Sequence, residues 1–175
     1  MSSRALYTIG HSTRTAEALL DLLREHGIEV LVDVRTIPRS RHNPQFNRDA
    51  LAESLAEAGI EYTHRAALGG LRHPRKDSVN LGWRNASFRG YADYMQTAEF
   101  ARALAELEAL ADARRTAIMC AEAVPWRCHR GLIADALTVR GRPVLHIQSP
   151  APPTPHQPTP FMRTVEGRPI YPLPD

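Results

Sequence analysis

Short apolar runs alternate with helical periods along the first 150 residues. Runs at 6–9, 30–34, 116–120 and 144–147 are mostly apolar, and 60–64 is a weaker example. Between them, apolar residues recur every three or four positions over 16–23, 51–58, 100–110 and 132–137. Such runs are typical of strands buried on both faces, and such spacing is typical of amphipathic helices. The pattern predicts an α/β fold, a single three-layer domain with a mostly parallel sheet of about five strands and helices on both faces.

Capping and stop residues set the expected helix ends. Thr13 or Thr15 can begin the first helix, which Gly27 would end, and Asn47 can begin the second, which Gly59 would end. Residues 65–90 contain four glycines and little periodicity, which predicts a long loop. The pattern is helical again over residues 91–112, and a last helix is expected to begin near residue 128.

The end of the chain has a different composition. Nine of the 14 prolines lie in the last 26 residues. Proline disfavours helices and central strands, so we expect an α/β domain over 1–149 and a proline-rich extension over 150–175. Phe161, Met162, Ile170 and Tyr171 give the extension apolar groups to bury, which predicts that it docks in part on the domain.

Charge and composition narrow the class of partner. The 175 residues include 22 basic and 19 acidic side chains, a net charge of +3. Residues 35–89 hold ten basic and five acidic side chains, a local surplus of +5, which leaves −2 for the rest. This surplus favours an anionic small molecule or nucleic acid as partner. No apolar run spans a bilayer and the N-terminus lacks a signal-peptide core, so we expect a cytoplasmic protein with no membrane partner.

Polar side chains follow the ends of the predicted strands. The first strand leads to His11 and Ser12, the second to Asp33, Arg35 and Arg39, and the fourth to Cys120 and Glu122. Because carboxyl ends of parallel strands meet at one edge of a sheet, these residues are expected to form one site. Arginine forks bind phosphate or carboxylate, and Asp33 can hold Arg35 in place.

The segment 120–130 carries the densest chemistry. Cys128, His129 and Arg130 are expected in the first turn of a helix, where unpaired backbone N–H groups attract anions. That setting lowers a cysteine pKa, so Cys120 or Cys128 is a candidate thiolate, although Cys120 is equally explained as a packed core residue. Glu122 can act as a general base or orient a neighbouring cation.

Several other chemistries lack sequence support. The spacing of Cys120, Cys128 and His129 matches no common zinc site, so no metal is expected. The loop from Cys120 to Arg127 resembles phosphatase and sulfurtransferase loops but is one residue longer. Nucleotide-binding glycine motifs are absent from the sequence, so no cofactor is expected.

Several motifs together resemble a known family. They are Thr8–Ser12, Asp33–Arg35 with Pro38 and Ser40, Leu68–Gly70, Tyr91–Met95, Cys120–Glu122, Cys128–Arg130 and His146–Ile147. Over about residues 5–150 the chain resembles the bacterial family called domain of unknown function 488. The resemblance implies a compact α/β domain and these site positions, and it implies no reaction.

Three hypotheses follow. The first is an enzyme or enzyme-like domain that binds an anionic ligand through Arg35, Arg39 and Arg130, with Asp33 and Ser12 beside them. In this hypothesis His11, Glu122 or His129 transfers protons and Cys120 or Cys128 is a nucleophile. The second is a non-catalytic nucleic-acid-binding accessory domain. The third is a protein-interaction module that uses the proline-rich tail. Substrate, reaction and oligomeric state stay open.

Overall fold

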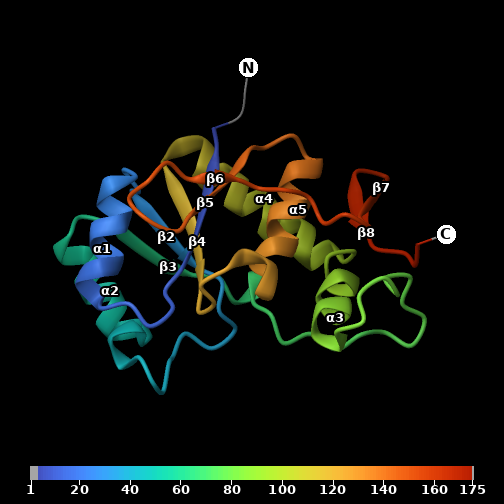
Figure 1. Cartoon of the computed structure of the whole chain (residues 1–175), viewed down its shortest axis with the longest axis horizontal. Helices are drawn as coiled ribbons and strands as arrows, with labels where there is room; N and C mark the ends of the chain where they lie inside the picture. Colours follow the sequence, from blue (N-terminus) through green and yellow to red (C-terminus); the bar gives the residue numbers. More distant parts are fainter. Residues whose placement is uncertain (1–3, 175) are drawn as a thin grey trace.

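The computed structural model describes residues 4–174, and its centre is one six-stranded sheet (Figure 1). The strand order is β3-β2-β4-β1-β5-β6, in which the first five strands are mutually parallel and β6 is antiparallel to β5. The predicted α/β fold with a mostly parallel sheet is therefore confirmed. The strands are β1 (Leu6–Gly10), β2 (Val30–Asp33), β3 (Glu61–His64), β4 (Thr116–Cys120), β5 (Val144–Ile147) and β6 (Thr154–Pro155).

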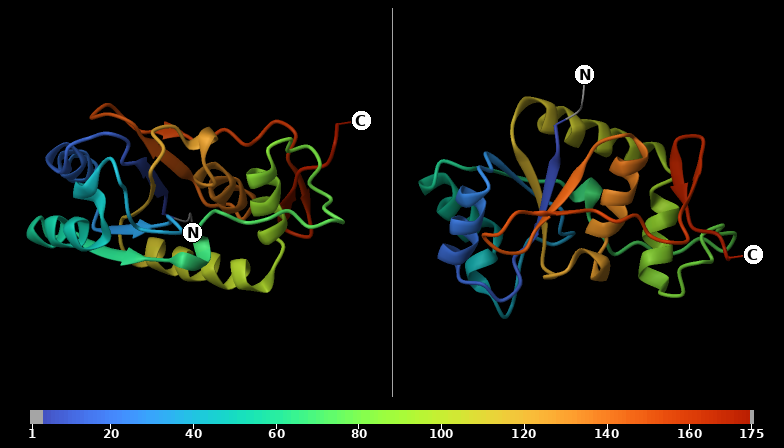
Figure 2. Two further views of the ribbon diagram at one scale, coloured as in Figure 1. Left: turned by 90° about the horizontal axis from the view of Figure 1, so that it is seen from below. Right: turned by 45° about the horizontal axis from the view of Figure 1, so that its top comes forward.

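Helices cover both faces of the sheet. They are α1 (Ala16–Glu25), α2 (Arg48–Glu57), α3 (Ala86–Tyr94), α4 (Ala98–Ala113) and α5 (Arg130–Val139). One core cluster joins α1 and α2 to the sheet, and the other joins α3, α4 and α5 to it. Figures 1 and 2 show α1 and α2 on the opposite side of the strands from α4 and α5. All three central strands, β2, β4 and β1, are almost wholly buried, as the apolar runs predict.

Local signals set most of the helix ends. The Thr15 side chain accepts a hydrogen bond from the Ala18 N–H (3.0 Å), so Thr15 rather than Thr13 begins α1. Gly27 and Gly59 follow α1 and α2 with φ of +68° and +75°, a backbone conformation that glycine adopts without strain.

The helical pattern over residues 91–112 is divided between two helices. The long loop ends early, at Asn85, whose side chain caps α3. The chain then turns at Thr97, whose hydroxyl accepts from the Phe100 N–H (3.2 Å) and so begins α4. Apolar periodicity continues across the break because both helices pack on the same core cluster.

The proline-rich extension lies across one edge of the domain (Figure 2). It supplies β6 and then a hairpin of β7 (Arg163–Val165) and β8 (Arg168–Ile170). Tyr171 is fully buried, and its N–H donates to the Asn80 side chain (2.9 Å). Among the residues that the structure describes, no helix has the length and apolar character needed to cross a membrane.

Candidate functional site

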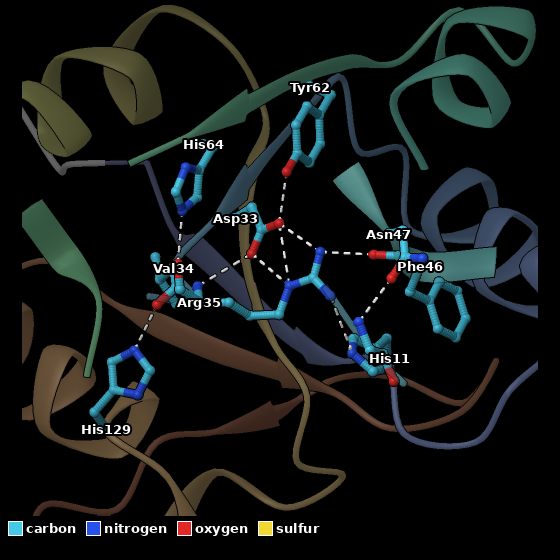
Figure 3. A network of polar contacts seen from close by, with 10 residues as sticks. His11, Asp33, Val34, Arg35, Phe46, Asn47, Tyr62, His64 and His129 are labelled. Atoms are coloured by element: carbon cyan, nitrogen blue, oxygen red, sulfur yellow. Dashed lines mark hydrogen bonds and ion pairs between the residues drawn. The ribbon is translucent and has the colours of Figure 1, made fainter. Parts of the chain in front are cut away.

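The carboxyl edge of the sheet is organised around a buried ion pair between Asp33 and Arg35 (Figure 3). The Arg35 Nη2 atom lies 2.7 Å from Asp33 Oδ2, and its Nε atom lies 2.9 Å from Asp33 Oδ1. Tyr62 donates its hydroxyl to Asp33 (2.6 Å), and the Phe46 carbonyl accepts from Arg35 Nη2 (2.8 Å). Desolvation by burial and the hydrogen bond to Asp33 raise the pKa of Tyr62, so its hydroxyl stays a donor.

His11 lies beside this ion pair. Its Nδ1 atom is 2.8 Å from the Ser12 carbonyl, which makes Nδ1 the protonated donor and leaves Nε2 to accept from Arg35 Nη1 at 3.5 Å. The ring packs on Phe46 with 4.5 Å between ring centroids. Desolvation, and the charge of Arg35, lower the pKa of His11. Ser12 has φ of +49°, and its backbone N–H donates to the Ala121 carbonyl (3.0 Å).

Two further histidines bond to the backbone where β2 ends. His64 donates from Nε2 to the Arg35 carbonyl (2.7 Å), and His129 donates from Nε2 to the Val34 carbonyl (2.7 Å). The bond to Val34 places the proton of the neutral His129 ring on Nε2 and leaves Nδ1 unprotonated. Burial, together with the charges of Arg130 and Arg72 and against the bond to Val34, lowers the pKa of His129 to about 4. The imidazole is therefore neutral at physiological pH.

Cys120 and Cys128 face each other across the loop that leaves β4. Their sulfur atoms are 2.7 Å apart, and the Arg130 N–H donates to the Cys128 sulfur (3.2 Å). Burial opposes ionisation of Cys120, but the bond with Cys128 and the charge of Arg130 hold the pKa of Cys120 below its usual value. Burial and the same bond raise the pKa of Cys128. When the pair holds a single proton, that proton therefore lies mainly on Cys128.

The sequence places Cys128 and His129 in the helix, but the structure begins α5 one residue after His129. A 3-10 turn at Pro125–Arg127 occupies the preceding positions, because proline suits the first positions of such a turn. Cys128 consequently lies just outside the helix, where its sulfur receives a helix N-terminal N–H.

Arg130 is the most deeply buried charged group of this loop. Only 1% of its surface is exposed. Its Nη2 atom donates to the Ala123 carbonyl (3.3 Å), while within residues 4–174 nothing accepts a hydrogen bond from its Nε or Nη1 atom. Its charge acts on both cysteines, on His129 and on His146. Arg130 thus lies in the midst of these four side chains.

The remaining predicted residues lie at the surface. Arg39 and Glu122 are both exposed. The Glu122 backbone carbonyl belongs to the site nevertheless, since it lies 3.6 Å from the Cys120 sulfur. The structure therefore brings together His11, Asp33, Arg35, Cys120, Cys128, His129 and Arg130, with Ser12 contributing backbone, and leaves the side chains of Arg39 and Glu122 outside.

A pocket of about 600 Å³ opens beside the cysteine pair. Cys128, Trp126 and Leu132 line it from the α5 side, and His146 lines it from β5. Much of the remaining wall is the extension, from Thr154 to Phe161. Its volume falls within the range of small-molecule sites.

A buried polar chain joins this pocket to the core and was not expected from the sequence. His146 bonds to Thr8 through Nδ1 and to His156 through Nε2 (2.9 Å), and His156 bonds to Asp135 (2.7 Å). Asp135 also accepts from the Thr159 hydroxyl (2.6 Å) and from Tyr171 (2.8 Å). The one feature of the sequence that could have indicated this chain is Asp135, a charged residue within the apolar helical segment 132–137. Within residues 4–174, no group of three or more His, Cys, Asp or Glu side chains is arranged to hold a metal ion.

Together, the fold and this edge define an α/β domain with a cysteine–arginine cluster at the carboxyl ends of parallel strands. Residues 15–137, more than half of the chain, match the family described as domain of unknown function DUF488, and the chain belongs to that family. The family carries no assigned reaction in its description. Comparison with curated proteins returned no match, and comparison with solved structures returned none either.

Proposed function

We propose that this chain is an enzyme-like domain that performs cysteine chemistry on a small anionic molecule at the carboxyl edge of the sheet. Cys128 is the nucleophile, Cys120 exchanges the shared proton with it, and Arg130 attracts the negative charge of the ligand. Arg35 positions the edge and does not hold the ligand, because its guanidinium is already bound by Asp33.

The observation that carries the proposal is that Arg130 is buried without a carboxylate partner among residues 4–174. A buried cation normally has a carboxylate partner, because taking a charge out of water costs several kcal/mol. Arg35, which is also buried, has such a partner, whereas within residues 4–174 the Arg130 guanidinium bonds only to the Ala123 carbonyl. Arg130 therefore favours a negative charge in its surroundings, either a cysteine thiolate or an anionic ligand.

The surroundings of Cys128 support its role as nucleophile. It lines the pocket, whereas Cys120 is buried, so a ligand in the pocket reaches Cys128 first. The Arg130 N–H and the adjacent helix N-terminus favour a thiolate at Cys128 once its proton passes to Cys120. Transfer across the 2.7 Å that separates the two sulfur atoms is short.

Competing alkylation of the reduced protein by iodoacetate and iodoacetamide tests this proposal. The two reagents differ in charge, so the ratio of their rates at Cys128 reports attraction of an anion and cancels any change in thiolate fraction. We expect Arg130→Gln to lower the ratio roughly fivefold or more, and inorganic phosphate to slow iodoacetate selectively in the unaltered protein. Peptide mass spectrometry identifies the alkylated residue.

Two matched variants make the result specific. Arg127→Gln removes the same charge from an exposed neighbouring position and is expected to leave the ratio unchanged. Arg130→Lys keeps the charge and is expected to retain most of the selectivity. An unchanged ratio in folded Arg130→Gln, together with no effect of phosphate on the unaltered protein, contradicts the proposal.

A further inference from the structure

The two cysteines are placed as partners for each other. Their sulfur atoms lie 2.7 Å apart, about 0.7 Å more than the length of a disulfide bond, which is about 2.05 Å. Cys120 ends a central strand and Cys128 precedes α5, so two rigid elements hold the pair at this separation. Both are free thiols in the structure.

We propose that Cys120 and Cys128 are a redox-active pair that exchanges with low-molecular-weight disulfides and closes reversibly to an internal disulfide. This inference rests on the proposed function in that both use Cys128 as the attacking group, and it adds the class of substrate, a small disulfide that enters the pocket.

The exchange balances in two steps. The Cys128 thiol passes its proton to Cys120, the Cys128 thiolate attacks one sulfur of the small disulfide, and a mixed disulfide forms while the first small thiolate leaves and takes that proton from Cys120. The Cys120 thiolate then attacks the Cys128 sulfur, the internal disulfide forms, and the second small thiolate leaves and takes a proton from water. Both cysteines are oxidised, and the small disulfide is reduced to two small thiols.

The different exposures of the two cysteines set the order of the steps. Cys128 is half-buried and lines the pocket, so a disulfide can approach it. Cys120 is buried behind it with its sulfur 2.7 Å from the Cys128 sulfur, which is the position of a resolving thiol. Burial also protects Cys120 from direct attack by solvent reagents.

Arg130 makes the internal disulfide easy to reduce. The buried charge of Arg130 is stabilised by a neighbouring thiolate, and it loses this partner when the two sulfur atoms form a disulfide. The reduced form is therefore stabilised relative to the oxidised form. Removal of the charge should therefore favour the disulfide. We expect Arg130→Met to shift the exchange equilibrium toward the internal disulfide by roughly tenfold or more.

The test uses the full chain, reduced and then equilibrated with oxidised glutathione at several ratios of the oxidised to the reduced form. We expect intact monomer that is lighter by two hydrogen atoms, with a peptide that links Cys120 to Cys128, and complete recovery of both thiols on return to reduced glutathione. Cys120→Ser and Cys128→Ser separate the steps: the former should stop at the mixed disulfide on Cys128, and the latter should scarcely react.

Opposite outcomes overturn the inference. They are a native protein in which both thiols stay free, one that stops at the mixed disulfide, or one that forms only disulfides between chains. The alkylation ratio is measured on the reduced protein, so the two ideas fail separately. Loss of charge selectivity with a closing disulfide contradicts the anion site, whereas retained selectivity without a disulfide contradicts only the redox pair.

Discussion

Asp33 and Arg35, two residues apart at the end of β2, form a buried ion pair in which one arginine nitrogen lies 2.7 Å from a carboxylate oxygen. The Phe46 carbonyl, the Tyr62 hydroxyl and the His11 ring complete the surroundings of the pair. Arg35 therefore links β2 to β3, to the end of β1 and to the turn before α2. Its guanidinium is held by Asp33 and by the Phe46 carbonyl, so Arg35 supports this edge of the sheet.

Removing the carboxylate of this pair should strongly destabilise the protein. Asp33→Asn leaves Arg35 as a buried cation without an anionic partner, and breaking a buried pair in this way costs about 3–5 kcal/mol. Tyr62→Phe removes only one neutral donor to the same carboxylate and should cost about 1–2 kcal/mol. Urea unfolding measures both. A loss in Asp33→Asn no larger than in Tyr62→Phe would show that the pair contributes little.

The stability of the protein should depend on pH through His129. Its pKa is lowered from 6.5 to about 4 by burial, so the unfolded chain binds a proton between these values and the folded chain does not. Stability is therefore greatest above about pH 6.5 and falls as the pH decreases to about 4, by about 3 kcal/mol from this residue. His146, with its pKa lowered to about 3, adds a loss of the same sign.

Unfolding by urea between about pH 7 and about pH 4.5 measures this dependence. His129→Gln, which cannot titrate, should flatten the slope, and His73→Gln, at an exposed position, should leave it unchanged. Equal slopes in the two variants would mean that His129 titrates normally in the folded protein.

The sequence predicts the strands and their ends well because those signals are local. The runs at 116–120 and 144–147 match β4 and β5, and the carboxyl-edge rule brings His11, Asp33 and Cys120 to one place. It also predicts that Asp33 holds Arg35 in place, and the two side chains form an ion pair. It does not reveal the contact of His156 with Asp135, which joins segments 21 residues apart through the path of the extension.

Gly10 should tolerate no side chain. A Cβ atom there would lie 1.7 Å from the Glu122 carbonyl oxygen, which is backbone and cannot move without shifting the loop that joins the two cysteines. Gly10→Ala should therefore destabilise the fold by about 2 kcal/mol or more and loosen the cysteine pair. Thermal unfolding and the rate at which Cys128 reacts with a chromogenic disulfide report these two effects.

Gly59→Ala is the matched control for this change. No atom lies within 4 Å of a Cβ at Gly59, although its φ of +75° disfavours alanine. It should lose about 1 kcal/mol from backbone strain without any change in thiol reactivity. Increased reactivity of Cys128 in Gly59→Ala as well would attribute the effect to general instability rather than to the loop.

The extension should stabilise the domain through Asp135. This carboxylate is fully buried, and the groups that bond to its two oxygens, His156, Thr159 and Tyr171, all come from the extension. Tyr171→Phe deletes one donor to a buried charge and should cost about 1.5–3 kcal/mol. Tyr7→Phe, which changes a half-buried tyrosine on β1, should cost less.

Because the extension also walls the pocket, Tyr171→Phe should increase the access of iodoacetamide to Cys128. Unfolding free energies and alkylation rates of the two variants measure both effects, and equal values for the two would contradict a stabilising role of the extension at Asp135.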